Sequence, residues 1–175
     1  ITMHQGRAIQ SRSPESILGE VRALAQTPGF SGHVSHLGGP TANMYRMRCT
    51  KPEAEAVCRR LSCVHPTVCK LLGTSHEPTK ALMREARAVP GVVKVHIASG
   101  IRMDLARKDP EYLAELAPHH LGGHLKVAPE HVSERVLARM KKPGIEAFEE
   151  FAERFEAASR RAGKEQFLVP CFIAS

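Results

Sequence analysis

Four cysteines lie within 21 residues and form the densest group of metal-binding side chains in the chain. Their spacing is Cys-x8-Cys-x4-Cys-x5-Cys, at Cys49, Cys58, Cys63 and Cys69. Four thiolates suit a tetrahedral site for a thiophilic metal such as Zn²⁺, or an iron–sulfur cluster. Because the close Cys-x2-Cys pairs of zinc ribbons are absent, separate reduced thiols and disulfides stay open as alternatives.

The surroundings of these cysteines favour thiolates over disulfides. The chain opens Ile1-Thr2-Met3-His4 with no secretory signal, so a reducing, cytoplasmic location is expected. Four thiolates around a divalent ion carry a net charge of about −2. Basic residues that would offset this charge flank them, at Arg48, Arg59, Arg60 and Lys70. His65 is an alternative ligand, whereas Cys171 lies in an apolar run and is expected in the core.

Three further groups of glycine and polar residues each follow an apolar stretch. In the first, Leu37-Gly38-Gly39-Pro40, paired glycines would let the backbone approach a ligand closely. In the second, Ala98-Ser99-Gly100-Ile101-Arg102, the guanidinium fork suits a carboxylate or phosphate. The third provides candidate binding or acid–base groups at Lys126, Glu130 and His131. The ordinary alternatives are a turn, a surface arginine, an exposed strand face and a first helical turn.

Hydrophobic periodicity predicts the elements that must position these groups. Helices are expected over residues 13–26, 79–88, 110–116, 133–140 and 145–162. Strands are expected over residues 33–37, 92–98, 124–128 and 167–173, and residues 40–78 show no regular period. Because parallel neighbours need helical crossovers, the alternation predicts a parallel α/β sheet, either doubly wound or a (β/α) barrel. The three groups would then lie at the carboxyl ends of strands, where such folds bind ligands.

The composition is that of an ordinary globular protein. Of the 175 residues, 42% are hydrophobic and 25% charged, and no apolar run approaches the roughly 18 residues of a membrane span. The net charge of +7 suits an anionic partner such as nucleic acid, but the basic residues are scattered and Trp is absent. A solvated basic surface is the preferred interpretation. Since the chain starts without Met and stops inside an apolar strand, we expect it to be a fragment.

Six stretches of the chain together resemble the YgiQ-type radical S-adenosylmethionine (SAM) proteins. They are HQGR (4–7), LGGPTANMY (37–45), CRRLSC (58–63), IASGIR (97–102), LKVAPEH (125–131) and KKPG (141–144). Long motifs in a fixed order are specific, and the similarity covers essentially the whole chain.

This resemblance implies a fold and a chemistry. The fold is a partial (β/α)6 radical SAM barrel, a TIM-barrel relative, forming one domain over residues 1–175 with a cysteine-bearing insertion at 40–78. In such enzymes an electron donor such as flavodoxin or ferredoxin reduces a [4Fe–4S] cluster, which cleaves SAM to a deoxyadenosyl radical. The Cys-x3-Cys-x2-Cys loop that holds this cluster does not occur in the chain and is expected just upstream. The fragment alone would then be inactive, and its catalytic residues and its substrate are unknown.

The resemblance also implies candidate SAM contacts. Gly38 and Gly39 match the glycine pair whose backbone binds the methionyl amino group, while Pro40 stands where a glutamate is usual. The SAM carboxylate and ribose would be held at later strand ends, by Ser99, Arg102, Lys126, Glu130 and His131. The four cysteines then become a second metal or iron–sulfur site, or a structural staple. The alternative class of function is a metal-stabilised module that binds RNA or another anion without catalysis.

Overall fold

The computed structural model describes residues 8–39, 41–98 and 100–174 of the chain. Its helices are α2 (Pro14–Ala25), the single-turn η1 (Ala42–Met44), α3 (Pro52–Val57), α4 (Glu77–Arg87), α5 (Met103–Ala106), α6 (Pro110–His119), α7 (Glu134–Met140) and α8 (Glu146–Arg161). Its strands are β1 (His33–Val34), β2 (Lys94–Val95), β3 (His124–Glu130) and β4 (Phe167–Phe172). Among the described residues, no helix combines the length and the apolar character that a membrane crossing requires.

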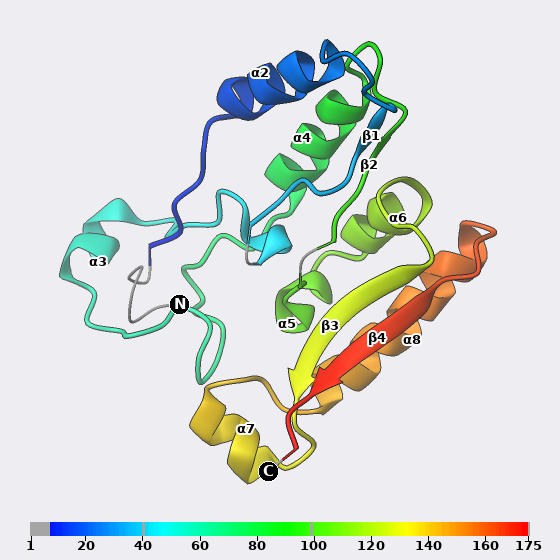
Figure 1. Ribbon diagram of the computed structural model, residues 1–175. Helices are drawn as coiled ribbons and strands as arrows, with labels where there is room; N and C mark the ends of the chain where they lie inside the picture. Colours follow the sequence, from blue (N-terminus) through cyan, green and yellow to red (C-terminus); the bar gives the residue numbers. More distant parts are fainter. Residues whose placement is uncertain (1–7, 40, 99, 175) are drawn as a thin grey trace.

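The strands form two parallel pairs in chain order (Figure 1). β1 pairs with β2 through His33 opposite Lys94, and β3 pairs with β4 through His124 opposite Phe167. Helix α4 lies in the connection from β1 to β2, and α8 lies in the connection from β3 to β4. Parallel pairing needs such helical crossovers. The partial (β/α)6 barrel stays a prediction, because the described strands form two separate pairs and no closed barrel.

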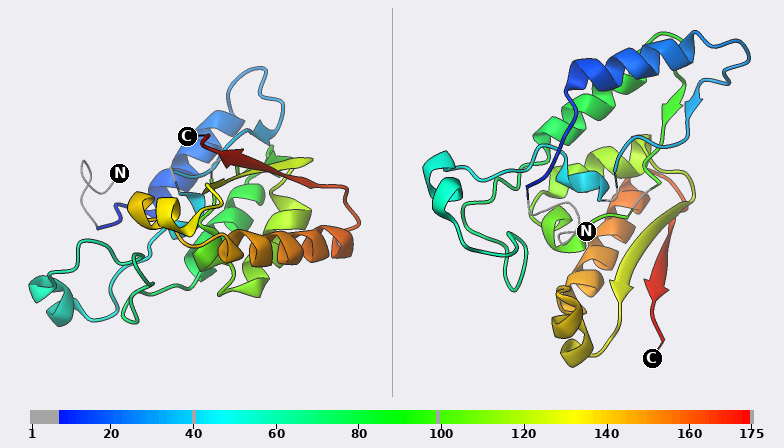
Figure 2. Two further views of the ribbon diagram at one scale, coloured as in Figure 1. Left: turned by 90° about the horizontal axis from the view of Figure 1, so that it is seen from below. Right: turned by 60° about the vertical axis from the view of Figure 1, so that its left-hand side comes forward.

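Each strand pair has its own apolar core. Leu18 and Val21 of α2 pack with Leu82 of α4 and Val95 of β2 in one core. Helices α5, α6 and α8 cover β3 in the other, where Phe151 is fully buried. Figures 1 and 2 show α2 and α4 beside the first pair and α8 along the second, while α6 lies near the start of β3. Alternating exposure along β3 leaves its other face uncovered by described residues.

His120 joins the two halves. It is fully buried, its Nδ1 lies 2.9 Å from the Val95 carbonyl oxygen, and its own carbonyl accepts a hydrogen bond from the Ile97 amide at 2.9 Å. Burial lowers the pKa of its imidazole. The chain before β3 is therefore fixed against the continuation of β2.

Residues 46–74, which we call the cysteine segment, project from the side of the molecule (Figure 2). An isolated antiparallel bridge between Cys49 and Leu72 closes the segment. Its contact with the rest of the chain is a small core of Met47, Leu72 and Leu105. This segment contains α3, which the sequence pattern did not predict, because six residues show too little of a helical period.

Cys171 corrects one expectation from the sequence. It was expected in the core because β4 is an apolar run, yet its side chain is exposed. β4 is bonded to β3 on one side and has no partner on its other side among the described residues. Its residues are therefore largely uncovered, with Phe167 53% and Phe172 48% exposed.

The uncovered edge predicts self-association of the 175-residue chain, because an unpaired apolar strand is a template for pairing with another chain. Dynamic light scattering should detect species larger than a monomer. Val169→Lys on β4 should lower the apparent mass, whereas Val57→Lys, on the exposed part of α3, should not. A monodisperse monomer for the unmodified chain would contradict this prediction.

Candidate functional site

A cavity of about 1300 Å³ extends from α2 and α4, past β1 and the loops that follow β1 and β2, to the cysteine segment. It is lined by the segment before α2 (residues 8–12), by β1 and its continuation (residues 33–39), and by Ile97 and Arg102 after β2. Of the candidate SAM contacts, Gly38, Gly39 and Arg102 line this cavity. Two distant stretches of sequence are thus brought to one space by the pairing of β1 with β2.

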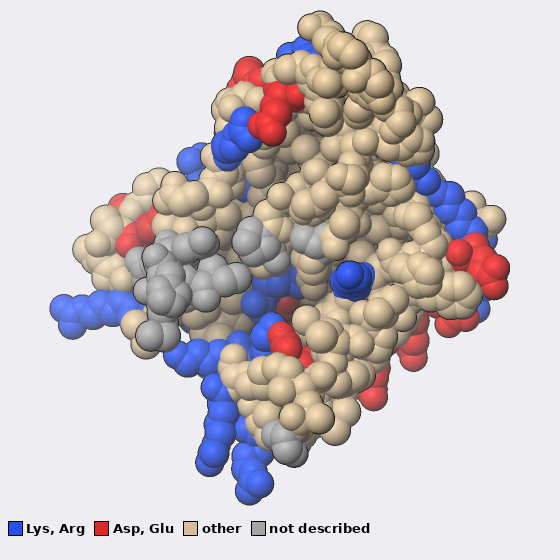
Figure 3. Space-filling view, viewed as in Figure 1, with Lys and Arg blue, Asp and Glu red and all other residues tan. Residues whose placement is uncertain are grey.

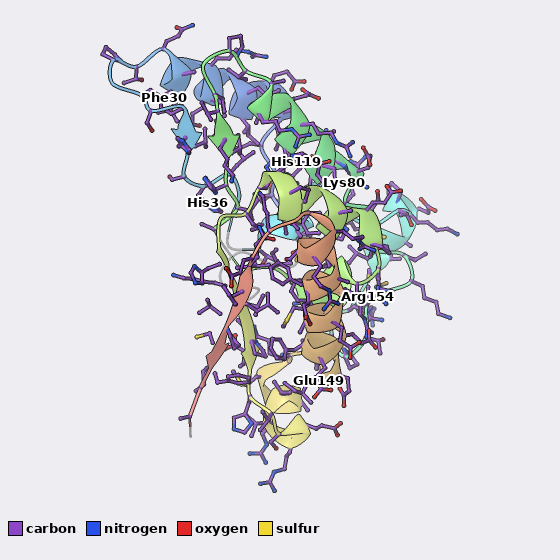
Figure 4. The ribbon with its side chains drawn as sticks, turned by 90° about the vertical axis from the view of Figure 1, so that its right-hand side faces the viewer. Phe30, His36, Lys80, His119, Glu149 and Arg154 are labelled. Carbon is purple, nitrogen blue, oxygen red and sulfur yellow. The ribbon has the colours of Figure 1, made fainter. Side chains whose placement is uncertain are left out.

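Backbone and side-chain hydrogen bonds extend the pairing of the two strands to the edge of the cavity. The Leu37 amide donates to the His96 carbonyl at 2.8 Å, and the Ala98 amide donates to His36 Nδ1 at 3.0 Å. Figure 4 shows His36 on the strand side of the molecule, below the first strand pair. The His36 imidazole therefore accepts the hydrogen bond of the Ala98 amide beyond the last backbone bond between the two strands.

The glycine pair has two different environments. Gly38 has φ +157°, and a Cβ added there would meet His36 Cε1 at 3.0 Å and the Ala42 Cβ at 3.2 Å. A Cβ added to Gly39 would meet no atom of the described residues within 4 Å. Gly38 is therefore required by the local backbone, whereas Gly39 leaves space beside its backbone in the cavity wall.

Asn43 ties the loop after β1 to the loop after β2. Its side-chain carbonyl accepts from the Arg102 amide at 2.8 Å, and its amide group donates to the Arg102 carbonyl at 3.0 Å. One residue earlier, the Ala42 amide donates to the Gly100 carbonyl at 3.2 Å. Asn43 is fully buried, so losing its side chain would remove the partner of the Arg102 amide. The Arg102 carbonyl would keep its bonds from the Leu105 and Ala106 amides. We call the two bonds between Asn43 and Arg102 the Asn43–Arg102 clasp.

His76 supports the clasp from behind. Its Nε2 lies 3.2 Å from Asn43 Nδ2, its ring stacks on Tyr112 at 4.4 Å between centroids, and its Nδ1 lies 3.5 Å from Asp109 Oδ2. Burial lowers the pKa of His76 to about 4, although Asp109 favours the charged form. The imidazole is therefore neutral at neutral pH, with Nε2 as the acceptor that Asn43 needs.

Lys80 carries a charge in the same region but belongs to the scaffold. It is 3% exposed, and its Nζ lies 3.1 Å from Glu77, 3.2 Å from Glu111 and 3.6 Å from Asp109. Burial acts to lower its pKa, but the bonds to Glu77 and Glu111 outweigh burial and raise it. Figure 4 shows Lys80 on the helical side, away from His36, so it joins α4 to α6 and does not face the cavity.

Arg102 is partly committed within the protein. Its Nε donates to Asp104 Oδ1 at 3.0 Å and its terminal nitrogen donates to Asp104 Oδ2 at 2.6 Å. A guanidinium has five N–H donors, so the pair with Asp104 leaves donors for a further anion. Asp104 thus fixes the orientation of Arg102 at the cavity wall.

The remaining candidates do not join this cavity. Lys126 is exposed on β3, Glu130 pairs with Lys142 at 2.7 Å, and His131 Nδ1 accepts from the Ser133 amide at 2.8 Å. All three belong to the second strand pair. Ser99 and Pro40 lie outside the described residues.

Charge is unevenly distributed on the face seen in Figure 3. Lysine and arginine side chains project at the lower left, near the cysteine segment and α7, and acidic side chains gather at the right-hand edge beside α8. Most of the upper right of this face carries no charge. This pattern is a mixed surface, without one continuous basic stripe on the face in view.

All four clustered cysteines line a second, smaller cavity of about 200 Å³. Cys49 and Cys63 also line the large one. Among the described residues, no three His, Cys, Asp or Glu side chains already surround one ion position.

The structure adds Asn43, His76 and Asp109 to the residues that shape the site. Asn43 lies within the glycine-bearing motif, but the sequence does not show its contact with Arg102, 59 residues away. The sequence marks Asn43 only as a short polar residue between Ala42 and Met44. The sequence does not mark His76 or Asp109 as part of a site, because each belongs to no motif and simply precedes a helix, α4 or α6.

Comparison with known proteins identifies the family. The chain is 57% identical over its full length to a UPF0313 protein of Shewanella oneidensis and 56% identical to one of Chromobacterium violaceum. It is 54% identical to the UPF0313 protein YgiQ of Escherichia coli K12. The chain belongs to the UPF0313 family. It spans 22%, 23% and 24% of the length of these three relatives, respectively.

Two other comparisons found nothing for this UPF0313 chain. No family profile matches it, and no solved structure matches it.

The two glycines should respond differently to alanine. Gly38→Ala should lower the free energy of unfolding of the UPF0313 chain by about 1–3 kcal/mol, because it strains the backbone and displaces His36. Gly39→Ala should change it by less than about 0.5 kcal/mol, because a methyl group there meets no atom in the part of the chain that the structure describes. Urea denaturation of both variants measures the difference, and equal losses would contradict this assignment.

His76 should make stability fall in acid. The unfolded imidazole binds a proton near pH 6.5, whereas the folded one binds it only near pH 4. Between these values the unfolded state holds more protons, so stability decreases as the pH falls from 6.5 to 4. His76→Gln should flatten the slope in this window, whereas the exposed His33→Gln should not. Parallel slopes for His76→Gln and the unmodified chain, from urea denaturation at several pH values, would exclude a neutral buried His76.

Proposed function

We propose that the UPF0313 chain supplies the SAM-binding part of a radical SAM enzyme. The observation that carries this proposal is the cavity that passes the loops after β1 and β2, which the Gly38–Gly39 pair and Arg102 both line. Radical SAM proteins are also what the ordered sequence motifs resemble. The reaction and the substrate of the full-length protein stay open.

The residues of the cavity fit the two ends of SAM. The Gly38–Gly39 backbone can approach an ammonium group closely, and its carbonyls can accept hydrogen bonds from it. Arg102 has donors left for a carboxylate after pairing with Asp104. Leu37, Met44 and Ile97 form an apolar wall that would cover the rest of the ligand.

In this proposal the protein groups bind and orient, while the hard chemistry belongs to the cofactors. SAM and a reduced [4Fe–4S] cluster together supply a carbon radical that abstracts hydrogen from the substrate. The cluster would be held by cysteines outside this chain, in the full-length protein. The Asn43–Arg102 clasp keeps the amino-binding and carboxylate-binding groups at a fixed spacing, so that the ligand meets a preorganised site.

The test is equilibrium binding of SAM to the full-length protein, purified anaerobically, together with reductant-dependent SAM cleavage. Gly39→Val should raise the Kd for SAM at least tenfold, about 1.4 kcal/mol, because its side chain fills the space that the ligand would use. Gly19→Val is the matched control and should bind like the unmodified protein, because Gly19 lies on α2 and no atom of the described residues comes within 4 Å of its added Cβ.

Unchanged SAM affinity in Gly39→Val would remove the glycine pair from the site. A full-length protein that neither binds nor cleaves SAM would overturn the proposed function. Salt-dependent RNA binding in its place would favour the non-catalytic alternative, since phosphate contacts release counterions.

A further inference from the structure

The four clustered cysteines are gathered at one small cavity by the backbone of the cysteine segment. Cys49, Cys58, Cys63 and Cys69 all line the cavity of about 200 Å³, although up to 20 positions separate them in sequence. Of the five other lining residues, Ala54, Leu71 and Leu72 are apolar, and Glu55 and Arg60 carry opposite charges. All four cysteines of the Cys-x8-Cys-x4-Cys-x5-Cys pattern therefore lie around this one cavity.

The first tie is the bridge that closes the segment. Cys49 stands opposite Leu72, where the Thr50 amide donates to the Leu71 carbonyl at 2.8 Å and the Gly73 amide to the Arg48 carbonyl at 2.9 Å. Cys49 is thereby fixed next to the strand-like end of the segment that follows Cys69.

Two further ties bring in the other cysteines. The Leu72 amide donates to the Cys69 carbonyl at 3.0 Å, and the Cys69 amide donates to the Cys63 carbonyl at 2.7 Å. Cys58 ends α3, and its amide donates to the Glu55 carbonyl at 3.2 Å. Each cysteine therefore has its own backbone anchor beside the cavity.

Arg60 shapes the loop that carries Cys63 and places positive charge beside the thiols. Its guanidinium donates to the Ser62 carbonyl at 3.2 Å and to the Thr67 carbonyl at 2.9 Å, and the residue lines the cavity. A nearby cation lowers the cost of converting thiols into thiolates. Arg60 therefore both holds the loop that carries Cys63 and lines the cavity.

Apolar packing accounts for only part of this arrangement. Among the described residues, Met47 and Leu72 of the segment are buried against Leu105 of α5, and the partly buried Cys63 and Cys69 pack against them. Val57 and Leu61 are 77% and 79% exposed. All five cysteines of the chain are thiols, so no disulfide staples the segment. A segment with so small a core is one in which a metal can supply the missing stability.

We propose that Cys49, Cys58, Cys63 and Cys69 bind a thiophilic metal centre, either one Zn²⁺ ion or an iron–sulfur cluster, that stabilises the cysteine segment. Four cysteines are the common ligand set of both. Binding replaces four S–H bonds by four S–metal bonds and releases four protons, with no change of oxidation state for Zn²⁺. The thiols must turn further toward the cavity that they line, since no three described ligand side chains yet surround one point.

The test is metal and acid-labile sulfide analysis of the full-length protein, purified anaerobically, with Cys58→Ser, Cys63→Ser and the control Cys171→Ser. Cys171 is exposed on β4 and does not line the cavity. Each of the first two variants should lose one zinc, or one cluster's iron and sulfide together, relative to the unmodified protein. Cys171→Ser should lose nothing. Measuring the difference between variants separates this centre from any cluster bound elsewhere in the full-length protein.

A second measurement needs no cysteine variant to fold. Chelation of the metal from the unmodified protein should raise the rate of proteolytic cleavage within residues 46–74 several-fold, and Zn²⁺ or cluster reconstitution should reverse it. Equal metal content in all variants, or a cleavage rate that chelation leaves unchanged, would overturn the proposal. Gly39→Val should keep the full metal content, so loss of SAM binding and loss of this centre are distinguishable.

Discussion

The Asn43–Arg102 clasp is the interaction on which the candidate site depends most. Parallel strands bring the loops that follow them to one edge, but they do not fix those loops to each other. The buried Asn43 side chain does so here by binding both the amide and the carbonyl of Arg102, next to the bond from the Ala42 amide to the Gly100 carbonyl. Because neutral His76 lies against Asn43, the clasp in turn relies on the packing of α4 and α6. Asn43 thus connects the cavity wall to His76 of the scaffold.

Much of the local structure follows from sequence pattern. The long helices α2, α4 and α8 were predicted within a few residues, because each has several turns of apolar periodicity. The shorter α3 and α5 were missed for lack of such turns. The predicted strand over 92–98 proved to be the two residues Lys94–Val95, although hydrogen bonds continue the pairing to Leu37. The exposure of Cys171 depends on the strands available to cover β4, which periodicity does not reveal.

The sequence pattern predicted only part of the candidate site. Gly38, Gly39 and Arg102 were singled out from the sequence, and the structure places them around one cavity. The second strand pair carries Lys126, Glu130 and His131, away from this cavity. The sequence pattern does not show how far apart the strand ends lie, because that distance depends on how the sheet closes. Asn43 and His76 act through contacts 33 and 59 residues apart in sequence, which no local pattern encodes. The shared cavity of the four cysteines likewise required the bridge between Cys49 and Leu72.

The central claim is that the ends of β1 and β2 form one SAM-binding surface. Amide hydrogen exchange of the full-length protein, with and without SAM, tests it most directly, because exchange reports each backbone segment separately. If these strand ends bind SAM, it should slow exchange in residues 37–43 and in residues 97–102 together. Protection in neither segment, or protection confined to residues 124–131, would contradict it.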